Sequence, residues 1–267
     1  MSDLVDDRVK KGNASVVNIF SIVQDVTFGA YTMESTLLLH NSLFISSVLF
    51  NSQSWSRLSK KEVEKLKGCQ ISFLKRMMHA PKSTPNVITL CELGILPIDF
   101  EISSRKLMFL HHILKFLHYI LKLDQTDPVK EVYTEQLKYE YEENWAQDVK
   151  KIRESISLET DDDSISELSK SSWKTRVNNK IKDAALRKLN SDCERLKRVT
   201  RQYPELKTRD YLLKLSIGEA RIAFAYRTGT LDIKCYRTYS YEDLKCRACG
   251  EGMENIGHIV NQCKAQN

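Results

Sequence analysis

The chain has 267 residues, of which 42% are hydrophobic and 28% are charged. This length and composition indicate one large or two small folded domains and exclude an intrinsically disordered chain. With only 9 glycines and 5 prolines, the composition favours helices over a strand-rich sandwich. The net charge of +6 conceals two blocks, since residues 127–167 carry −8 and residues 168–214 carry +9. The basic block is therefore a candidate surface for phosphate.

The N-terminus and the apolar stretches show no signal for export or for a membrane span. The first residues, MSDLVDDRVKKGN, are charged and lack the apolar centre of a signal peptide. The most apolar stretch, residues 37–50, is short and contains polar side chains, so it predicts a buried helix. We therefore expect an intracellular protein, in the nucleus or the cytoplasm, with no membrane partner. Its cysteines are then reduced or bind metal, and Cys69, Cys91 and Cys193 are predicted core thiols.

Helix start and stop signals recur along the first half of the chain. Ser59 and Glu62 form a capping box, which predicts that a helix begins at this point. Pro85 predicts the start of a short helix that Gly94 can end. Pro97 then opens a long helix, in which apolar residues recur every three or four positions.

The second half of the chain also has a helical pattern. Asp127 and Pro128 open a third long helix, whose apolar stripe runs to Ile156. Residues 157–166 (SLETDDDSIS) are polar and predict a linker and a domain boundary. Residues 231–241 predict a short strand or extended arm. Three more capping boxes predict helix starts, namely Ser164 with Glu167, Ser191 with Glu194, and Ser216 with Glu219. The predicted fold class is mainly α.

Three cysteines and a histidine near the end of the chain have the spacing of metal ligands. The pattern is C-x2-C-x8-H-x4-C, formed by Cys246, Cys249, His258 and Cys263. Three thiolates and one imidazole complete a tetrahedron and leave no position for water, which is typical of one structural zinc ion. The alternative is four unrelated polar residues near a chain end, and it requires the ligand spacing to be accidental.

No residue pattern indicates an active site. Asp161, Asp162 and Asp163 resemble polymerase metal ligands only superficially, because serines and acids flank them and Glu159 stands where such motifs have an aromatic residue. These aspartates fit a solvated segment that caps the following helix. The sequence also has no glycine-rich phosphate loop and no convincing nucleophile–base pair. We therefore predict a protein that is not an enzyme.

Basic residues in two regions are candidates for binding nucleic acid. The basic block of residues 168–214 supplies Lys188 and Arg195, together with Arg198. Near the cysteines, cations alternate with aromatic residues, and this mixture suits single-stranded RNA or DNA. The cations of this second region are Arg221, Arg227, Lys234, Arg237, Lys245 and Arg247. The alternative for both regions is a solvated helix face with ordinary core aromatics.

Several segments, in their order along the chain, resemble the C-terminal end of reverse transcriptases from non-LTR (LINE-type) retrotransposons. The segments are residues 47–55 (SVLFNSQSW), 73–78 (FLKRMM), 83–85 (STP), 90–94 (LCELG), Leu96 with Pro97, Arg105, residues 219–229 (EARIAFAYRTG), and Cys246, Cys249, Glu254, His258 and Cys263. Their shared order carries the resemblance.

This resemblance implies an architecture and a set of partners. It implies a thumb-like helical region at residues 1–125, a charged helical linker region at 126–215, and a C-terminal helix plus CCHC zinc knuckle at 216–267. It also implies RNA or DNA as partner, and the missing polymerase part of the element as a further one. Because the family's aromatic-x-Asp-Asp signature and an endonuclease are absent, the resemblance implies a non-catalytic fragment of an RNA-directed DNA polymerase.

Two alternatives compete with this interpretation. In one, the chain is a protein-interaction scaffold, in which zinc only holds the tail together and the uneven charge docks an acidic or basic partner. In the other, the chain is a decayed copy of a retroelement without a selected function.

Overall fold

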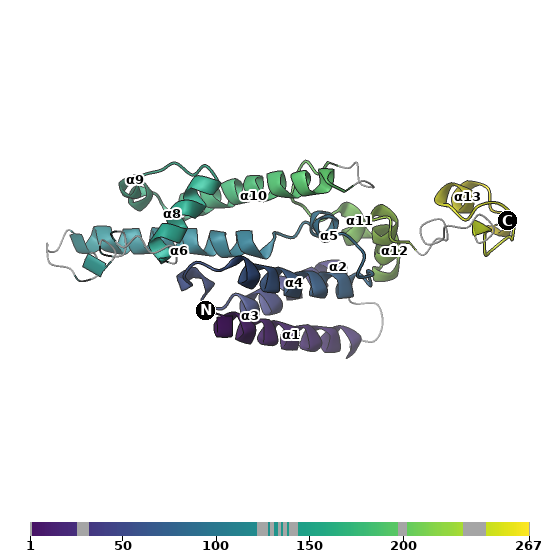
Figure 1. Ribbon diagram of the computed structural model, residues 1–267, viewed down its shortest axis with the longest axis horizontal. Helices are drawn as coiled ribbons and strands as arrows, with labels where there is room; N and C mark the ends of the chain where they lie inside the picture. Colours follow the sequence, from purple (N-terminus) through teal and green to yellow (C-terminus); the bar gives the residue numbers. More distant parts are fainter. Residues whose placement is uncertain are drawn as a thin grey trace.

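The computed structural model describes residues 2–25, 32–121, 128, 131–132, 135, 138, 144–196, 202–231 and 244–266. These residues are mainly helical and form no sheet, which confirms the mainly α fold class (Figure 1). None of the described helices has both the length and the apolar character needed to cross a bilayer. The elements are α1 Ser2–Asp25, α2 Met33–Leu39, η1 His40–Ile45, α3 Ser46–Val48, η2 Ser52–Ser54, α4 Lys60–Met77, α5 Asn86–Leu93, α6 Ile98–Leu121, α8 Trp145–Ser155, α9 Asp162–Glu167, α10 Lys170–Glu194, α11 Asp210–Lys214, α12 Ile217–Arg227, α13 Ile256–Asn261 and η5 Lys264–Gln266.

Local signals predict the boundaries of the first helices correctly. The capping box of α4 is present, since the Ser59 backbone N–H donates to Glu62 Oε2 at 2.7 Å and the Glu62 N–H donates to Ser59 Oγ at 3.3 Å. The α5 helix ends at Gly94, whose φ of 66° is left-handed. A Cβ at Gly94 would also lie 2.1 Å from the backbone nitrogen of Thr208. Glycine is therefore required here by both its conformation and its close neighbour.

The predicted third long helix is wrong in its continuity. Asn144 has extended backbone angles, and its side chain accepts a hydrogen bond from the Ala146 N–H at 2.9 Å. The α8 helix therefore begins at this cap, so the predicted stripe up to Ile156 does not belong to one continuous helix. Most of residues 127–143, like residues 232–241 of the predicted strand or arm, lie outside the described residues.

The predicted polar linker at residues 157–166 is wrong as well, because part of it is packed into the protein. Leu158 and Ile165 are buried, and α9 occupies the end of the segment. Its N-cap is Asp161, whose carboxylate accepts from the Ser164 N–H at 2.7 Å. Ser164 is therefore not the helix start that the sequence predicts. The three-aspartate segment does cap a helix, as predicted.

The long α10 helix also departs from the capping prediction. Ser169 is its N-cap, and its side chain accepts from the Ser172 N–H. The predicted helix start at Ser191 is wrong, because α10 continues past that residue. Leu189 and Cys193, on either side of it, are buried on the same stripe, and this packing outweighs the local capping signal. The predicted capping box at Ser216 and Glu219 is confirmed at the start of α12.

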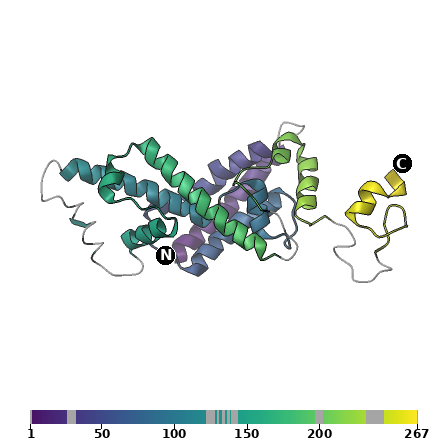
Figure 2. The ribbon, with the colours of Figure 1, turned by 90° about the horizontal axis from the view of Figure 1, so that it is seen from above.

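Two clusters of buried side chains hold the helices together. The first contains residues from 5 to 102 and from 189 to 224, and the second contains residues from 107 to 184. Both α6 and α10 contribute to both clusters, and α10 packs across α6 and extends past α5 (Figures 1 and 2). Trp173 is fully buried in the second cluster, where its Nε1–H donates to the Leu107 carbonyl at 2.9 Å. The second cluster thus joins residues from both sides of position 125.

The cysteines within the helices are buried, as predicted, and so is one histidine of α6. Cys69, Cys91 and Cys193 are buried. The His111 ring is buried, lies 3.0 Å from the Leu168 carbonyl and stacks on Trp173. Residues 37–48 are helical, and the stretch 37–50 is only partly buried, since Leu38 and Phe50 are exposed.

His40, at the start of the π-helical turn η1, makes stability depend on pH. Its ring packs against both Phe44 and Phe73, and its Nε2 is buried without a hydrogen-bond partner among the described residues. Burial lowers the pKa of His40 to about 4, while the unfolded chain protonates near 6.5. The unfolded state therefore binds more protons below pH 6.5, and stability falls as the pH drops from about 6.5 toward 4.

We expect His40→Leu to remove this pH dependence. Between pH 7 and pH 5, the wild type should lose about 2 kcal/mol more of its free energy of unfolding than the variant. Urea unfolding at both pH values measures the difference. His118→Leu, at an exposed histidine of α6, is the control and should keep the wild-type slope. Equal slopes for wild type and His40→Leu would contradict the assignment.

Candidate metal centre

The four predicted metal ligands come together in the C-terminal segment, residues 244–266. Their ligand atoms all lie within 4.8 Å of one another, so the group can hold a metal ion. The sulfurs of Cys246 and Cys263 are 3.9 Å apart, and Cys249 Sγ is 3.2 Å from His258 Nε2. Metal–sulfur bonds of about 2.3 Å in a tetrahedron place two sulfurs roughly 3.8 Å apart. The geometry therefore fits a four-ligand site.

A tight turn carries the first two ligands. An isolated bridge between Lys245 and Met253 closes the turn. Gly250 and Gly252 both have left-handed φ angles, 71° and 66°. A Cβ at Gly252 would lie 3.0 Å from the ring of His258, so this glycine also makes room for the imidazole.

A short helix presents the other two ligands. Asn255 caps α13 by accepting a hydrogen bond from the His258 N–H at 2.8 Å. Cys263 follows the end of this helix, and both ligands are buried. The Asn255 cap was not identified from the sequence, although an asparagine three residues before the ligand is a readable capping signal.

Glu254 also stabilises this turn. Its carboxylate is buried and accepts from the Arg247 backbone N–H at 2.8 Å and from the Arg247 guanidinium at 2.7 Å. Arg247, a predicted nucleic-acid contact, therefore also helps to hold the turn through its bonds to Glu254. Its side chain is still 52% exposed.

The thiols differ in how readily they ionise. The backbone N–H groups of Cys249 and Ala248 lower the pKa of the Cys246 thiol to about 6. At Cys263 the Ala265 N–H lowers the pKa, but burial and the neighbouring thiols outweigh it and raise the pKa overall. Of these two thiols, Cys246 therefore more readily supplies the thiolate that a metal requires.

The predicted nucleic-acid contacts are scattered, and several bind other parts of the protein. Arg227 pairs with buried Glu92 at 2.6 Å, and the Arg221 Nε–H donates to the Met77 carbonyl at 3.1 Å. Lys188 pairs with Asp99 at 3.1 Å. Of the other predicted residues, Lys245 is exposed, and Arg195 is exposed and lies beside Asp192. Arg198, Lys234 and Arg237 lie outside the described residues.

Comparisons with protein-family models, with curated proteins and with solved structures find no match for this chain. The Cys/His group and the distribution of basic side chains are the features that carry chemistry.

Proposed function

We propose that residues 244–266 form a zinc knuckle in a chain that binds RNA or DNA and catalyses no reaction. The observation that carries this proposal is the convergence of Cys246, Cys249, His258 and Cys263 within 4.8 Å. Three thiolates with one imidazole favour zinc, and four protein ligands leave no position for a reacting water. The zinc is then structural, one ion per chain.

Exposed cations beside the ligands support nucleic acid as the partner. Lys245 is exposed on the bridge next to Cys246, and Arg247 is half-exposed one residue beyond. Met253, on the opposite side of the bridge, exposes 39% of its surface. Cations beside an exposed apolar side chain offer phosphate pairing and a surface on which a base can pack.

Two contacts join distant segments that carry the likeness to non-LTR reverse transcriptases. Glu92 lies in one of the segments that resemble the family, and Arg227 lies in another, 135 positions away along the chain; the two pair directly. Arg105 likewise donates to the Leu49 carbonyl at 2.9 Å, which joins two further segments. We therefore propose that the chain is the thumb, linker and knuckle portion of such an element.

A second candidate function is a protein-interaction scaffold. Exposed apolar side chains on and next to α11 and α12 favour it, because such side chains mark protein contacts. They are Leu213, Leu215, Ile222 and Tyr226, which expose 44%, 39%, 64% and 48% of their surfaces. Capture of a protein that survives nuclease treatment would favour this candidate over nucleic-acid binding.

Salt-dependent binding tests the proposal. We expect zinc-loaded protein to bind labelled RNA or DNA, with an affinity that falls at least tenfold between about 50 and 200 mM salt. Gel shifts over a salt series measure it. In Cys246→Ser/Cys249→Ser, zinc and the knuckle's share of the binding should be lost together. Gln262→Ser, which adds a serine beside Cys263, should behave as wild type. Zinc-loaded wild type that shows no salt-sensitive binding would refute the proposed function.

A further inference from the structure

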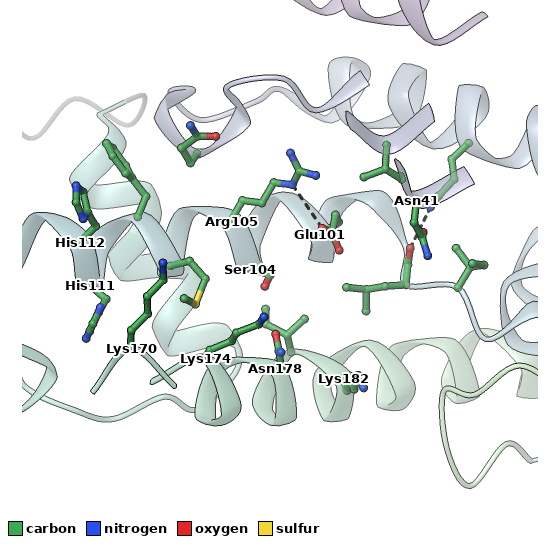
Figure 3. Close-up of a pocket in the computed structure, with 18 of the residues that line it drawn as sticks. Asn41, Glu101, Ser104, Arg105, His111, His112, Lys170, Lys174, Asn178 and Lys182 are labelled. Atoms are coloured by element: carbon green, nitrogen blue, oxygen red, sulfur yellow. Dashed lines mark hydrogen bonds and ion pairs between the residues drawn. The ribbon is translucent and has the colours of Figure 1, made fainter. Parts of the chain in front are cut away.

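A groove lies between α6 and α10, remote in sequence from the knuckle (Figure 3). Its volume is about 910 Å³. Its α6 wall runs from Glu101 to Lys115, and its α10 wall runs from Lys170 to Lys182. At 1.5 Å per helical residue, each wall is about 20 Å long. The groove is thus elongated and suits a linear ligand better than a compact one.

The charge of the groove is strongly positive. Glu101 is the one carboxylate among its described lining residues, and Arg105 Nε lies 3.4 Å from it. The other charged lining residues are four exposed lysines, and none forms an ion pair or side-chain hydrogen bond with a described residue; they are Lys115, Lys170, Lys174 and Lys182. Unpaired cations around a concave surface concentrate anions.

The cations of the α10 wall have a regular spacing. Lys170, Lys174 and Lys182, with Asn178 between the last two, recur every four residues, so neighbouring members lie about 6 Å apart along the helix, and all four line the groove. Figure 3 shows Lys174 and Asn178 extending from α10 toward α6. A row of evenly spaced donors matches a ligand with evenly spaced charges, such as the phosphates of an extended strand.

Flat rings accompany the cations on the α6 wall. Phe109 and His112 both line the groove, and their rings stack with centroids 6.4 Å apart and an interplanar angle of 24°. His112 is exposed, so its outer face is open to a ligand. A cationic groove with an accessible ring is the arrangement that single-stranded nucleic acids use, because phosphates pair while bases stack. An acidic peptide would use the charges but has no bases to stack.

We propose that this groove binds a single-stranded segment of RNA or DNA. Lys170, Lys174 and Lys182 neutralise phosphates along the strand, and His112 stacks on a base. The inference rests on the proposed nucleic-acid binding, and it assigns part of that binding to the helical body, to residues other than those of the knuckle.

Two charge-matched triple variants of the full, zinc-loaded chain test this assignment. Lys170→Gln/Lys174→Gln/Lys182→Gln removes three cations from the groove. Arg176→Gln/Lys180→Gln/Arg187→Gln removes three from α10 residues that do not line it. We expect the groove triple to weaken binding of a labelled single-stranded oligonucleotide by 10- to 100-fold at about 0.1 M salt, and to reduce the slope of log affinity against log salt by about 2. The control triple should change affinity less than about threefold.

Fluorescence anisotropy measures the affinities, and circular dichroism verifies that both triples keep their helices. His112→Ala should weaken binding several-fold, whereas His118→Ala, on the same helix but outside the groove, should not. Equal losses in the two triples would overturn the groove assignment and leave the proposed function standing. Displacement of the oligonucleotide by polyglutamate at equal charge concentration would overturn it in favour of an acidic protein segment. A wild type that binds no nucleic acid would overturn both proposals.

Discussion

Wild-type protein is expected to hold one zinc ion per chain, and Cys263→Ser is expected to hold none. Removing one thiolate leaves an incomplete tetrahedron, and a segment this small has no core of its own to compensate. In zinc-finger peptides the metal contributes about 10–16 kcal/mol, which is also the folding free energy. Residues 244–266 should therefore lose their fold. Elemental analysis after dialysis measures the zinc, and the thiolate–cobalt absorption of a Co²⁺-loaded sample reports the sulfur ligands.

Gln262→Ser places the same new residue next to Cys263 and is the matched control; it should keep one zinc. The helical body should not respond to zinc removal, because no described residue of 244–266 belongs to either core cluster. The thermal unfolding midpoint of the helices should then be the same with and without chelator. Full zinc occupancy in Cys263→Ser would contradict the four-ligand site.

Replacement of Glu92 by glutamine is expected to cost about 3 kcal/mol of folding free energy. Glu92 is fully buried and accepts two hydrogen bonds from Arg227, at 2.6 and 2.9 Å, and one each from the hydroxyls of Tyr203 and Tyr211, both at 3.1 Å. Burial and the charge of Glu92 raise the pKa of both tyrosines, so their hydroxyls stay protonated and donate. A neutral amide has one acceptor oxygen and cannot satisfy four donors. The cost lies at the lower end of the range for buried pairs because the Arg227 side chain is 32% exposed.

Urea unfolding followed by circular dichroism measures this loss as a lower midpoint at an unchanged slope. Glu64→Gln is the matched control, since its carboxylate is 70% exposed and pairs with Lys67 at the surface. It should stay within about 0.5 kcal/mol of wild type. A Glu92→Gln variant as stable as Glu64→Gln would show that the buried carboxylate adds nothing to the fold.

Features set by near neighbours in the chain could be predicted from the sequence. The caps at Ser59 and Ser216, the helix end at Gly94, and the approach of the four metal ligands all depend on residues within a short span. Each involves a bond or a backbone angle that the local residue types determine. These predictions are confirmed because each depends mainly on residues close by in the chain, although Gly94 is also required by its close contact with Thr208.

Features set by tertiary packing could not be predicted in this way. Ser191 has the residues of a cap but lies inside α10, because Leu189 and Cys193 are buried on one continuous stripe. Arg227 looked like a phosphate ligand, and its partner Glu92 lies 135 positions away with no local signal. The groove between α6 and α10 was missed for the same reason, since the sequence does not indicate which helices lie side by side.

The continuity of α6 and α10 determines how the groove responds to a ligand. Each helix is anchored in one core cluster near one end and in the other cluster near the opposite end. Both helices that form the groove are therefore held rigidly, and the spacing of the groove's lysines is fixed before a ligand binds. On binding, a flexible strand would lose most of its conformational entropy, whereas the protein would lose little. The groove would then select strands that can adopt an extended conformation whose phosphate spacing matches the fixed spacing of the lysines.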